Sequence, residues 1–375
     1  MDAPDTATIS AHESPQALSA RIVDGVLAFM AQDGASDEAF NRQALELFAH
    51  QFAHNAPFQR FCRQRGKTPR TVKSWRDIPA VPISAFKALS LTSQPPSSTD
   101  RVFMTSGTTQ GDVKGKHHHP TLAVYDASMR ANFGRRFMQG QDRIAMGILF
   151  PTEEVMPNSS LAHYLALALQ TFGLPGSGYF IGPAGLDTAG LCAALAQAEA
   201  TGQPYALLGA SYSLVHLMDA LAQQGRKFVL PAGSRVLDTG GFKGQSREIP
   251  MAQFYAQLTA LLGVAPGQCI NMYGMTELST QFYDDGNALL PAVKSGPHWI
   301  RSRLVNPLSG EEVAHGERGV LAHCDLANFN SVTTILTEDV GVAVEGGFLL
   351  LGRAEGTQAK GCSLAVEEFL QAARA

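Results

Sequence analysis

The apolar run Ile144-Ala145-Met146-Gly147-Ile148-Leu149-Phe150 has the length and composition of a buried strand. Two further short apolar runs follow at 206–208 and 236–237. Helical periodicity occupies the stretches between and after these runs, over 161–172, 189–199, 214–224 and 252–262. Because strands that alternate with helices favour βαβ units, the sequence predicts an α/β fold built on a covered, mainly parallel sheet.

The regions on either side of this core have other patterns. Apolar residues recur at helical spacing over 18–30 and 40–52, so the first hundred residues are expected to be mainly helical. After Pro291 the pattern becomes short strands with turns, and a short amphipathic stretch ends the chain. We therefore predict three parts: a helical N-terminal region (1–100), an α/β core (101–290) and a β-rich C-terminal part (291–375).

Composition and charge exclude several classes of protein. The 375 residues are 45% hydrophobic and 17% charged, as in a globular chain with a large core. A formal net charge of −4 argues against a nucleic-acid partner, since such surfaces are usually strongly basic. No apolar run approaches the roughly 20 residues of a membrane span. The first fifteen residues lack a secretory signal, and five scattered cysteines form no disulfide framework, so we expect a cytoplasmic protein.

Several familiar signatures are missing from the sequence. No segment fits the Walker A pattern, and no GxGxxG opens a helix after the early strands. Gly209-Ala210-Ser211-Tyr212-Ser213 breaks the GxSxG nucleophile elbow at its last position. His117-His118-His119 suggests a metal site, but adjacent side chains diverge and no CxxC or HExxH partner accompanies them. We therefore expect an exposed loop segment there.

A loop rich in hydroxyls follows residue 104. Thr105-Ser106-Gly107-Thr108-Thr109 offers four hydroxyls, together with backbone amides that can approach an anion closely. Lys114 and Lys116 follow and add positive charge. A polar surface turn without a ligand has the same composition, so the loop alone leaves both interpretations open.

Two later segments carry residues suited to a nucleotide. In Asn271-Met272-Tyr273-Gly274-Met275-Thr276-Glu277, Tyr273 offers a flat face for a base, Thr276 a hydroxyl for a phosphate and Glu277 a hard oxygen for Mg²⁺. The alternative is a strand that ends in a turn before a helix capped by Glu277. Arg353 follows Asp339 by fourteen residues, and together they could grip two adjacent sugar hydroxyls or form a structural ion pair.

In this order the three segments resemble the motifs of the adenylate-forming superfamily of acyl-CoA synthetases, peptide-synthetase adenylation domains and luciferases, over about residues 101–362. The total length and the ending Gly352-Arg353-Ala354-Glu355-Gly356-Thr357-Gln358-Ala359-Lys360-Gly361-Cys362-Ser363-Leu364 narrow the resemblance to the LuxE acyl-protein synthetase family, as does the glycine pair in 237–243. The resemblance implies the large N-terminal domain of these enzymes, with covered, mainly parallel sheets and a small β-rich C-terminal part. It also implies loss of the usual mobile C-terminal lid.

The resemblance further implies a role for each matched residue. The ATP phosphates would contact Thr105, Ser106, Gly107, Thr108 and Thr109. Adenine and ribose would contact Gly240, Gly241, Tyr273, Asp339 and Arg353. Catalysis would use Thr276 at the α-phosphate, Glu277 as the Mg²⁺ ligand and Cys362 as the acyl acceptor.

Two departures from the superfamily pattern accompany these matches. Gln110 stands where the superfamily usually has glycine. The lysine that the lid supplies for adenylation is unassigned, and the candidates are Lys114, Lys116, Lys243 and Lys360.

The implied activity is that of an AMP-forming ligase. With ATP and Mg²⁺ as cofactors, the protein would activate a carboxylic acid, expected to be fatty, as its acyl-adenylate and load it onto Cys362. An extended segment from Arg353 to Cys362 could span roughly 30 Å, so the thiol could reach the adenylate and then swing out to a partner. That partner would be an acyl reductase.

Two alternatives stay open. An adenylating ligase for an aromatic or polyketide acid would pass the acyl group to CoA, an amine or an acyl-carrier protein. A nucleotide-binding scaffold subunit would carry out no catalysis at all.

Overall fold

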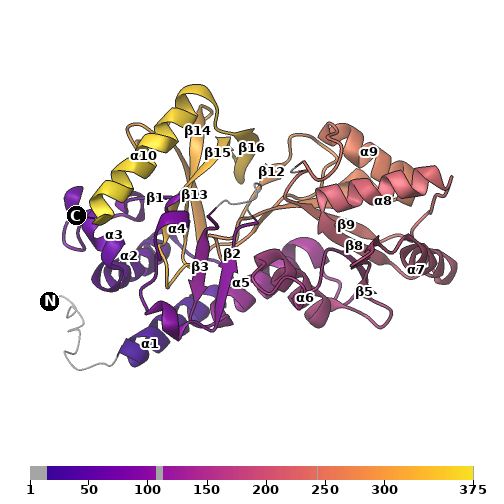
Figure 1. The fold of residues 1–375 in the computed structure, drawn as a ribbon, viewed down its shortest axis with the longest axis horizontal. Coiled ribbons are helices and arrows are strands. Elements are labelled where there is room, and N and C mark those ends of the chain that lie inside the picture. The colour runs from indigo at the N-terminus through magenta and orange to yellow at the C-terminus, as the bar shows by residue number, and fades with distance from the viewer. Residues whose placement is uncertain (1–14, 107–112, 243, 375) are drawn as a thin grey trace.

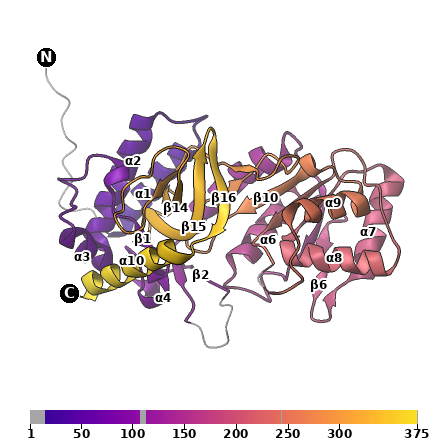
Figure 2. The ribbon, with the colours of Figure 1, turned by 90° about the horizontal axis from the view of Figure 1, so that it is seen from above.

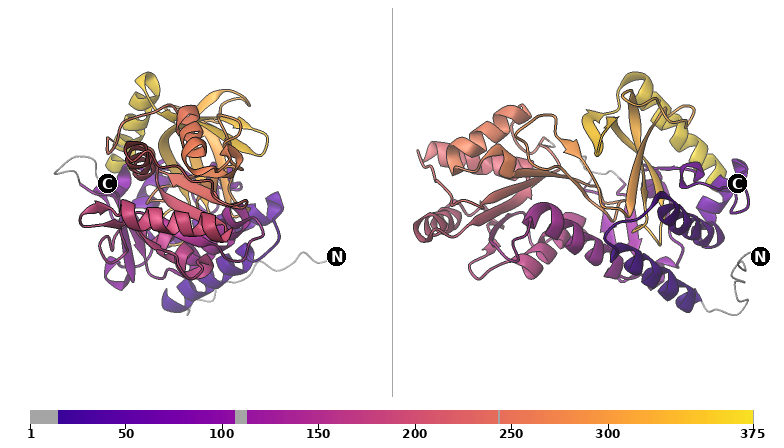
Figure 3. Two further views of the ribbon diagram at one scale, coloured as in Figure 1. Left: turned by 90° about the vertical axis from the view of Figure 1, so that its right-hand side faces the viewer. Right: turned by 180° about the vertical axis from the view of Figure 1, so that it is seen from behind.

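The structure is a computed structural model that describes residues 15–106, 113–242 and 244–374. Figures 1 and 3 show two lobes side by side, one with α1 to α4 and α10, the other with α6 to α9. The predicted loop residues Gly107, Thr108, Thr109 and Gln110, and the candidate Lys243, lie outside the described residues.

The predicted parallel sheet forms the centre of one lobe. Its six strands run in the order β11-β10-β9-β8-β4-β5, and every pair is parallel except β10–β11. The strands are β4 (Ala145–Leu149), β5 (Gly178–Tyr179), β8 (Tyr205–Ala210), β9 (Arg235–Thr239), β10 (Cys269–Tyr273) and β11 (Phe282–Tyr283). The α/β prediction is therefore confirmed, and the apolar runs at 144–150, 206–208 and 236–237 are its buried strands.

Helices cover both faces of this sheet, as near-continuous apolar strands require. On one face, alternate strand residues such as Leu207 and Val236 pack against α7 (Thr188–Thr201), α8 (Ser211–Gln223) and α9 (Met251–Leu262). On the other, Leu208 and Leu237 pack against α5 (Ala123–Phe133) and α6 (Ser160–Phe172). The last residues of β8, β9 and β10 line the cavities described below, together with residues of α6 and α9.

The second lobe contains the antiparallel sheet β12-β16-β15-β14-β13. Its strands are β12 (Val293–Lys294), β13 (Ile300–Val305), β14 (Arg318–Asp325), β15 (Thr334–Val344) and β16 (Gly347–Arg353), with β1 (Val81–Pro82) paired in parallel to β15. The two sheets meet where Tyr283 pairs with Ser295.

Helices from both ends of the chain pack on this second sheet. They are α1 (Pro15–Met30), α2 (Asp37–His54), α3 (Ala56–Gln64) and α10 (Gly356–Arg374). One hydrophobic core joins residues of α1, α2 and α3 with residues of β14, β15 and α10, and Figure 2 shows α10 lying across this lobe. The predicted helical region and the β-rich part thus share a core, while their boundaries at 100 and 290 stay a prediction.

Two antiparallel strands, β2 (Arg101–Met104) and β3 (Lys116–His119), pair on either side of the segment that the sequence singled out after residue 104. His117, His118 and His119 are all buried in β3, so the expectation of an exposed loop there is wrong. Pairing with β2 and packing against Phe86 and Phe103 outweigh the polarity of the imidazoles. Among the described residues no cluster of three His, Cys, Asp or Glu could hold a metal ion.

The remaining elements are short. They are α4 (Ala85–Ala88), the hairpin β6 (Ile181–Gly182) and β7 (Gly185–Leu186), and the single turns η1 (Trp75–Asp77), η2 (Pro96–Ser98), η3 (Gly134–Met138) and η4 (Pro266–Gln268). Over 15–106, 113–242 and 244–374, no helix has the length and apolar character needed to cross a membrane.

Candidate active site

A cavity of about 1090 Å³ lies where the carboxyl ends of β9 and β10 face the second lobe. It brings together almost all the predicted site residues that the structure describes. They are Thr105, Ser106, Gly240, Gly241, Tyr273, Thr276, Glu277, Asp339 and Arg353. Segments up to 248 residues apart in the chain, from Thr105 to Arg353, therefore line one cavity.

The floor of this cavity is a buried polar network that sequence reasoning missed. Asn271 donates its amide to Asp238 at 2.8 Å, and Tyr255 donates its hydroxyl to the same carboxylate at 3.0 Å. The ammonium of Lys294 bonds to the Asn271 side-chain oxygen at 2.5 Å and to Asp284 at 2.7 Å. The network fixes the ends of β9 and β10, because buried charges are stable only when paired and hydrogen-bonded.

Beyond the end of β9 the chain turns through Gly240 and Gly241, whose φ angles are 75° and 65°. Other residues rarely adopt this left-handed conformation, which explains the need for a glycine pair here. Without side chains, the two residues leave the rim of the cavity open to a flat ligand.

Tyr273 and Asp339 connect the two sheets across the cavity. The Tyr273 hydroxyl donates to Asp339 at 2.8 Å, and its ring packs against those of Phe282 and Phe348, with centroid distances of 5.9 and 5.8 Å. Arg353 lies opposite Asp339 in the β15–β16 ladder and donates to it at 3.4 Å, a long bond that leaves capacity for a ligand. Burial raises the pKa of Asp339, while the bonds from Tyr273 and Arg353 act in the opposite direction.

Thr276 and Glu277 lie in the turn that follows β10. No helix follows this turn, so the alternative in which Glu277 caps a helix is wrong. Glu277 is only 5% exposed, and its Oε1 lies 3.2 Å from the point where a Cβ on Gly115 would stand. Burial raises the pKa of this carboxyl to about 7, while its own backbone amide and Lys87 act in the opposite direction.

His117 holds this turn in place. Its Nδ1 donates to the Thr276 carbonyl at 3.0 Å, and its Nε2 lies 3.1 Å from the Ser331 hydroxyl. Burial lowers the pKa of His117 to about 4, so at neutral pH the ring is uncharged. The histidine run that suggested a metal site thus positions Thr276 and Glu277.

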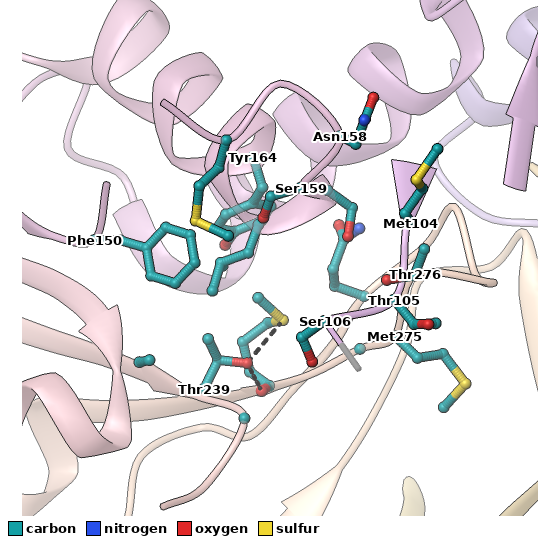
Figure 4. Close-up of a pocket in the computed structure, with 18 of the residues that line it drawn as sticks. Met104, Thr105, Ser106, Phe150, Asn158, Ser159, Tyr164, Thr239, Met275 and Thr276 are labelled. Carbon is teal, nitrogen blue, oxygen red and sulfur yellow. Dashed lines mark hydrogen bonds between the residues drawn. The ribbon is translucent and has the colours of Figure 1, made fainter. Parts of the chain in front are cut away.

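A second cavity, of about 570 Å³, adjoins the first and shares Thr105, Ser106, Gly240 and Thr276 with it. Figure 4 shows Phe150 and Tyr164 at one side and Ser106, Thr105 and Thr276 at the other. Its apolar lining comes from α6 and neighbouring strands, and it includes Met104, Phe150, Met156, Leu161 and Tyr164. Lys114 lies on its lining.

Cys362 lines neither cavity. It is 6% exposed on α10, with Sγ 3.9 Å from the Thr337 carbonyl oxygen and packed among Val320, Leu336 and Val340. Burial raises the pKa of this thiol to about 11, with Glu338 adding to the rise and Arg353 opposing it.

The expected extended arm between Arg353 and Cys362 is wrong, because the chain is helical from Gly356 onward. The α10 helix forms because its apolar face finds a partner in α3. The rings of Phe61 and Phe369 lie 4.8 Å apart, and Arg65 binds both carboxylate oxygens of Glu368, at 2.9 and 2.6 Å.

Comparison with known proteins now decides the family. A family model described as acyl-protein synthetase, LuxE, matches residues 17–371. The chain belongs to the LuxE acyl-protein synthetase family. Two curated relatives are long-chain-fatty-acid–luciferin-component ligases: the Vibrio harveyi protein is 21% identical, over 87% of this chain and 86% of its own, and the Aliivibrio fischeri protein is 20% identical, over 87% of each.

Solved structures show the same fold as this LuxE family member. 2-Hydroxyisobutyryl-CoA ligase in complex with its acyl-adenylate superposes with a TM-score of 0.61 at 15% identity, over 84% of this chain and 67% of that one. A second, open structure of that ligase gives a TM-score of 0.59 at 14% identity, over 84% of this chain and 74% of its own. The prediction of an adenylate-forming-enzyme fold is confirmed.

Proposed function

We propose that this LuxE family member is an AMP-forming ligase that activates a fatty acid as its acyl-adenylate and transfers the acyl group to Cys362. The observation that carries the proposal is the shared wall of the two cavities. A cavity lined by Glu277, Asp339 and Arg353, which would suit a nucleotide, adjoins a cavity lined by Phe150, Leu161 and Tyr164, which would suit an acyl chain. The two meet at Thr105, Ser106, Gly240 and Thr276. An acid bound in one would present its carboxylate to a phosphate bound in the other.

In the first step, a carboxylate oxygen attacks the α-phosphorus of ATP, and the bond from that phosphorus to pyrophosphate breaks. Adenine would bind between Gly240-Gly241 and Tyr273, and the ribose hydroxyls would bind Asp339 and Arg353. Thr276 lines both cavities, where the reacting groups would meet. Holding both reactants in place converts a bimolecular reaction into an effectively unimolecular one.

The chemistry of Glu277 fits a Mg²⁺ site. Its carboxylate lines the nucleotide cavity, and among the described residues no lysine or arginine forms an ion pair with it. Mg²⁺ is usually held by one or two carboxylates together with substrate phosphates, so a single acidic residue suffices. When bound, Mg²⁺ would supply positive charge that offsets the repulsion between the acid and the triphosphate.

In the second step, the Cys362 thiolate attacks the acyl carbonyl carbon, and AMP leaves. The thiol is buried outside both cavities with a raised pKa, so it must move and become exposed before it can react. An acyl reductase would then take the acyl group from the thioester.

Exchange of labelled pyrophosphate into ATP tests the first step. We expect exchange only when a carboxylic acid is added, with straight-chain fatty acids preferred over aromatic acids. Preference for aromatic acids would favour the alternative ligase, and no exchange with any acid would favour the scaffold. Incubation with labelled fatty acid and Mg-ATP should then leave a hydroxylamine-sensitive label on the protein.

A further inference from the structure

The segment around α4 brings a lysine to the nucleotide cavity from a region that the sequence motifs do not cover. Ile83, Ser84 and Lys87 all line the cavity. The segment is held firmly against β15, because the Ile83 amide donates to the Leu336 carbonyl at 2.9 Å and Ser84 donates to the Glu338 carboxylate at 2.6 Å. The position of the Lys87 backbone is therefore fixed relative to the cavity wall.

Lys87 differs from the other cations of this cavity in being unpaired. Lys294 is buried and bound to Asp284, and Arg353 donates to Glu338 at 2.5 Å and to Asp339 at 3.4 Å. In the part of the chain that the structure describes, the Lys87 ammonium makes no ion pair or side-chain hydrogen bond. Its charge nevertheless acts on Glu277, where it opposes the effect of burial on the carboxyl pKa.

The negative charge in the cavity exceeds what these paired cations can offset. Glu277, Glu338 and Asp339 line it, and bound ATP would add its triphosphate. When the bond between the α-phosphorus and the leaving oxygen breaks, negative charge accumulates on pyrophosphate. A lysine ammonium is a compact point charge suited to phosphate, and a positioned cation is most effective where such charge develops.

We propose that Lys87 binds the phosphate chain of the nucleotide and stabilises the departing pyrophosphate during adenylation. The inference rests on the proposed function of the cavity and adds a residue to it. Of the lysines that the sequence offered for this role, Lys114 lines the acyl cavity and Lys116 and Lys360 line neither cavity, while Lys243 lies outside the described residues.

The test compares Lys87→Ala, Lys87→Arg and, as a matched control, Lys227→Ala, an exposed lysine that lines neither cavity. We expect Lys87→Ala to lower kcat for acid-dependent pyrophosphate exchange by about 10²-fold with little change in KM for the acid. Lys87→Arg should restore part of the rate, and Lys227→Ala should match the unmodified protein.

Binding of an acyl-sulfamoyl adenosine separates this role from a structural one. This stable adenylate analogue lacks the pyrophosphate, so Lys87→Ala should bind it within about twofold of the unmodified protein. If Lys87→Ala loses analogue binding and kcat to the same extent, or keeps an unchanged kcat, the inference about Lys87 is overturned while the proposed function stands. Absence of exchange in the unmodified protein would overturn the proposed function as well.

Discussion

The nucleotide cavity and the helix α10 hold the two halves of the proposed reaction, and they are built in opposite ways. In the cavity, Tyr273, Glu277 and Asp339 face an open space of about 1090 Å³ that a ligand can enter. On α10, Cys362 faces a hydrophobic core and its thiol is held in the unreactive protonated form. In the proposed reaction, the structure therefore suits activation of the acid, whereas transfer to the thiol would require α10 to move.

The cavity is open and Cys362 is buried because the two proposed steps make different demands. A site that joins two anions needs preorganised polar groups before the substrates arrive. A free thiolate beside ATP and water would instead be open to oxidation and premature reaction. Cys362 is buried against Thr337, which directly precedes the cavity-lining residues Glu338 and Asp339, and its thiol lies outside the cavity.

The largest expected effect comes from Cys362→Ser. The hydroxylamine-sensitive label on the protein should vanish, because serine forms no thioester, while pyrophosphate exchange should stay within about twofold of the unmodified rate. Mass spectrometry of the labelled peptide, together with the exchange assay, checks both. Cys324→Ser, at another buried cysteine, serves as the control that should keep the label. Loss of exchange in Cys362→Ser would mean that the two parts do not act separately.

Glu277→Gln should reduce exchange by about 10²- to 10³-fold, since the amide cannot replace a charged Mg²⁺ ligand. Glu345→Gln, at an exposed position absent from the cavity linings, should leave the rate unchanged. If Glu277→Gln exchanges pyrophosphate at the unmodified rate across a series of Mg²⁺ concentrations, Glu277 is not the Mg²⁺ ligand.

The pH dependence of exchange should reflect the same carboxyl group. Because burial raises its pKa to about 7, Glu277 is ionised above that value and protonated below it. The rate should therefore fall by up to tenfold per pH unit below about 7, and higher Mg²⁺ concentrations should shift the midpoint downward, since metal and proton compete for one carboxylate. A flat profile between pH 5 and 8 would contradict this assignment.

Much of the candidate site could be predicted from the sequence alone. Tyr273, Thr276, Glu277, Asp339 and Arg353 lie in compact motifs, so their convergence was predictable without coordinates. The strands and helices of the parallel sheet were predictable for a similar reason, because their hydrophobic periodicity is local.

Features that depend on packing between distant segments were not predictable. Lys87 belongs to no motif and enters the cavity because β1 pairs with β15. The burial of His117 depends on its pairing partner β2, and the helical state of 356–374 depends on α3. The local pattern predicted neither feature. The imidazoles of the His117 run are polar and so indicated exposure, and the glycines within 356–374 argued against a helix.

The smallest predicted effect concerns the contact that holds α10. Arg65→Ala removes the exposed ion pair to Glu368, which is worth at most about 1 kcal/mol. Alkylation of Cys362 should therefore become about two- to fivefold faster, with pyrophosphate exchange unchanged. Arg247→Ala, which breaks an exposed pair with Asp219 on the other lobe, is the control. An unchanged alkylation rate would show that this ion pair does not limit exposure of the thiol.

The most direct test of the central claim is a crystal structure with a fatty acyl-sulfamoyl adenosine. We predict the adenine beside Gly240-Gly241 and Tyr273, the ribose hydroxyls on Asp339, and the acyl chain in the cavity lined by Phe150 and Tyr164. An analogue bound outside these two cavities, or an acyl chain that leaves the Phe150 cavity empty, would contradict the account.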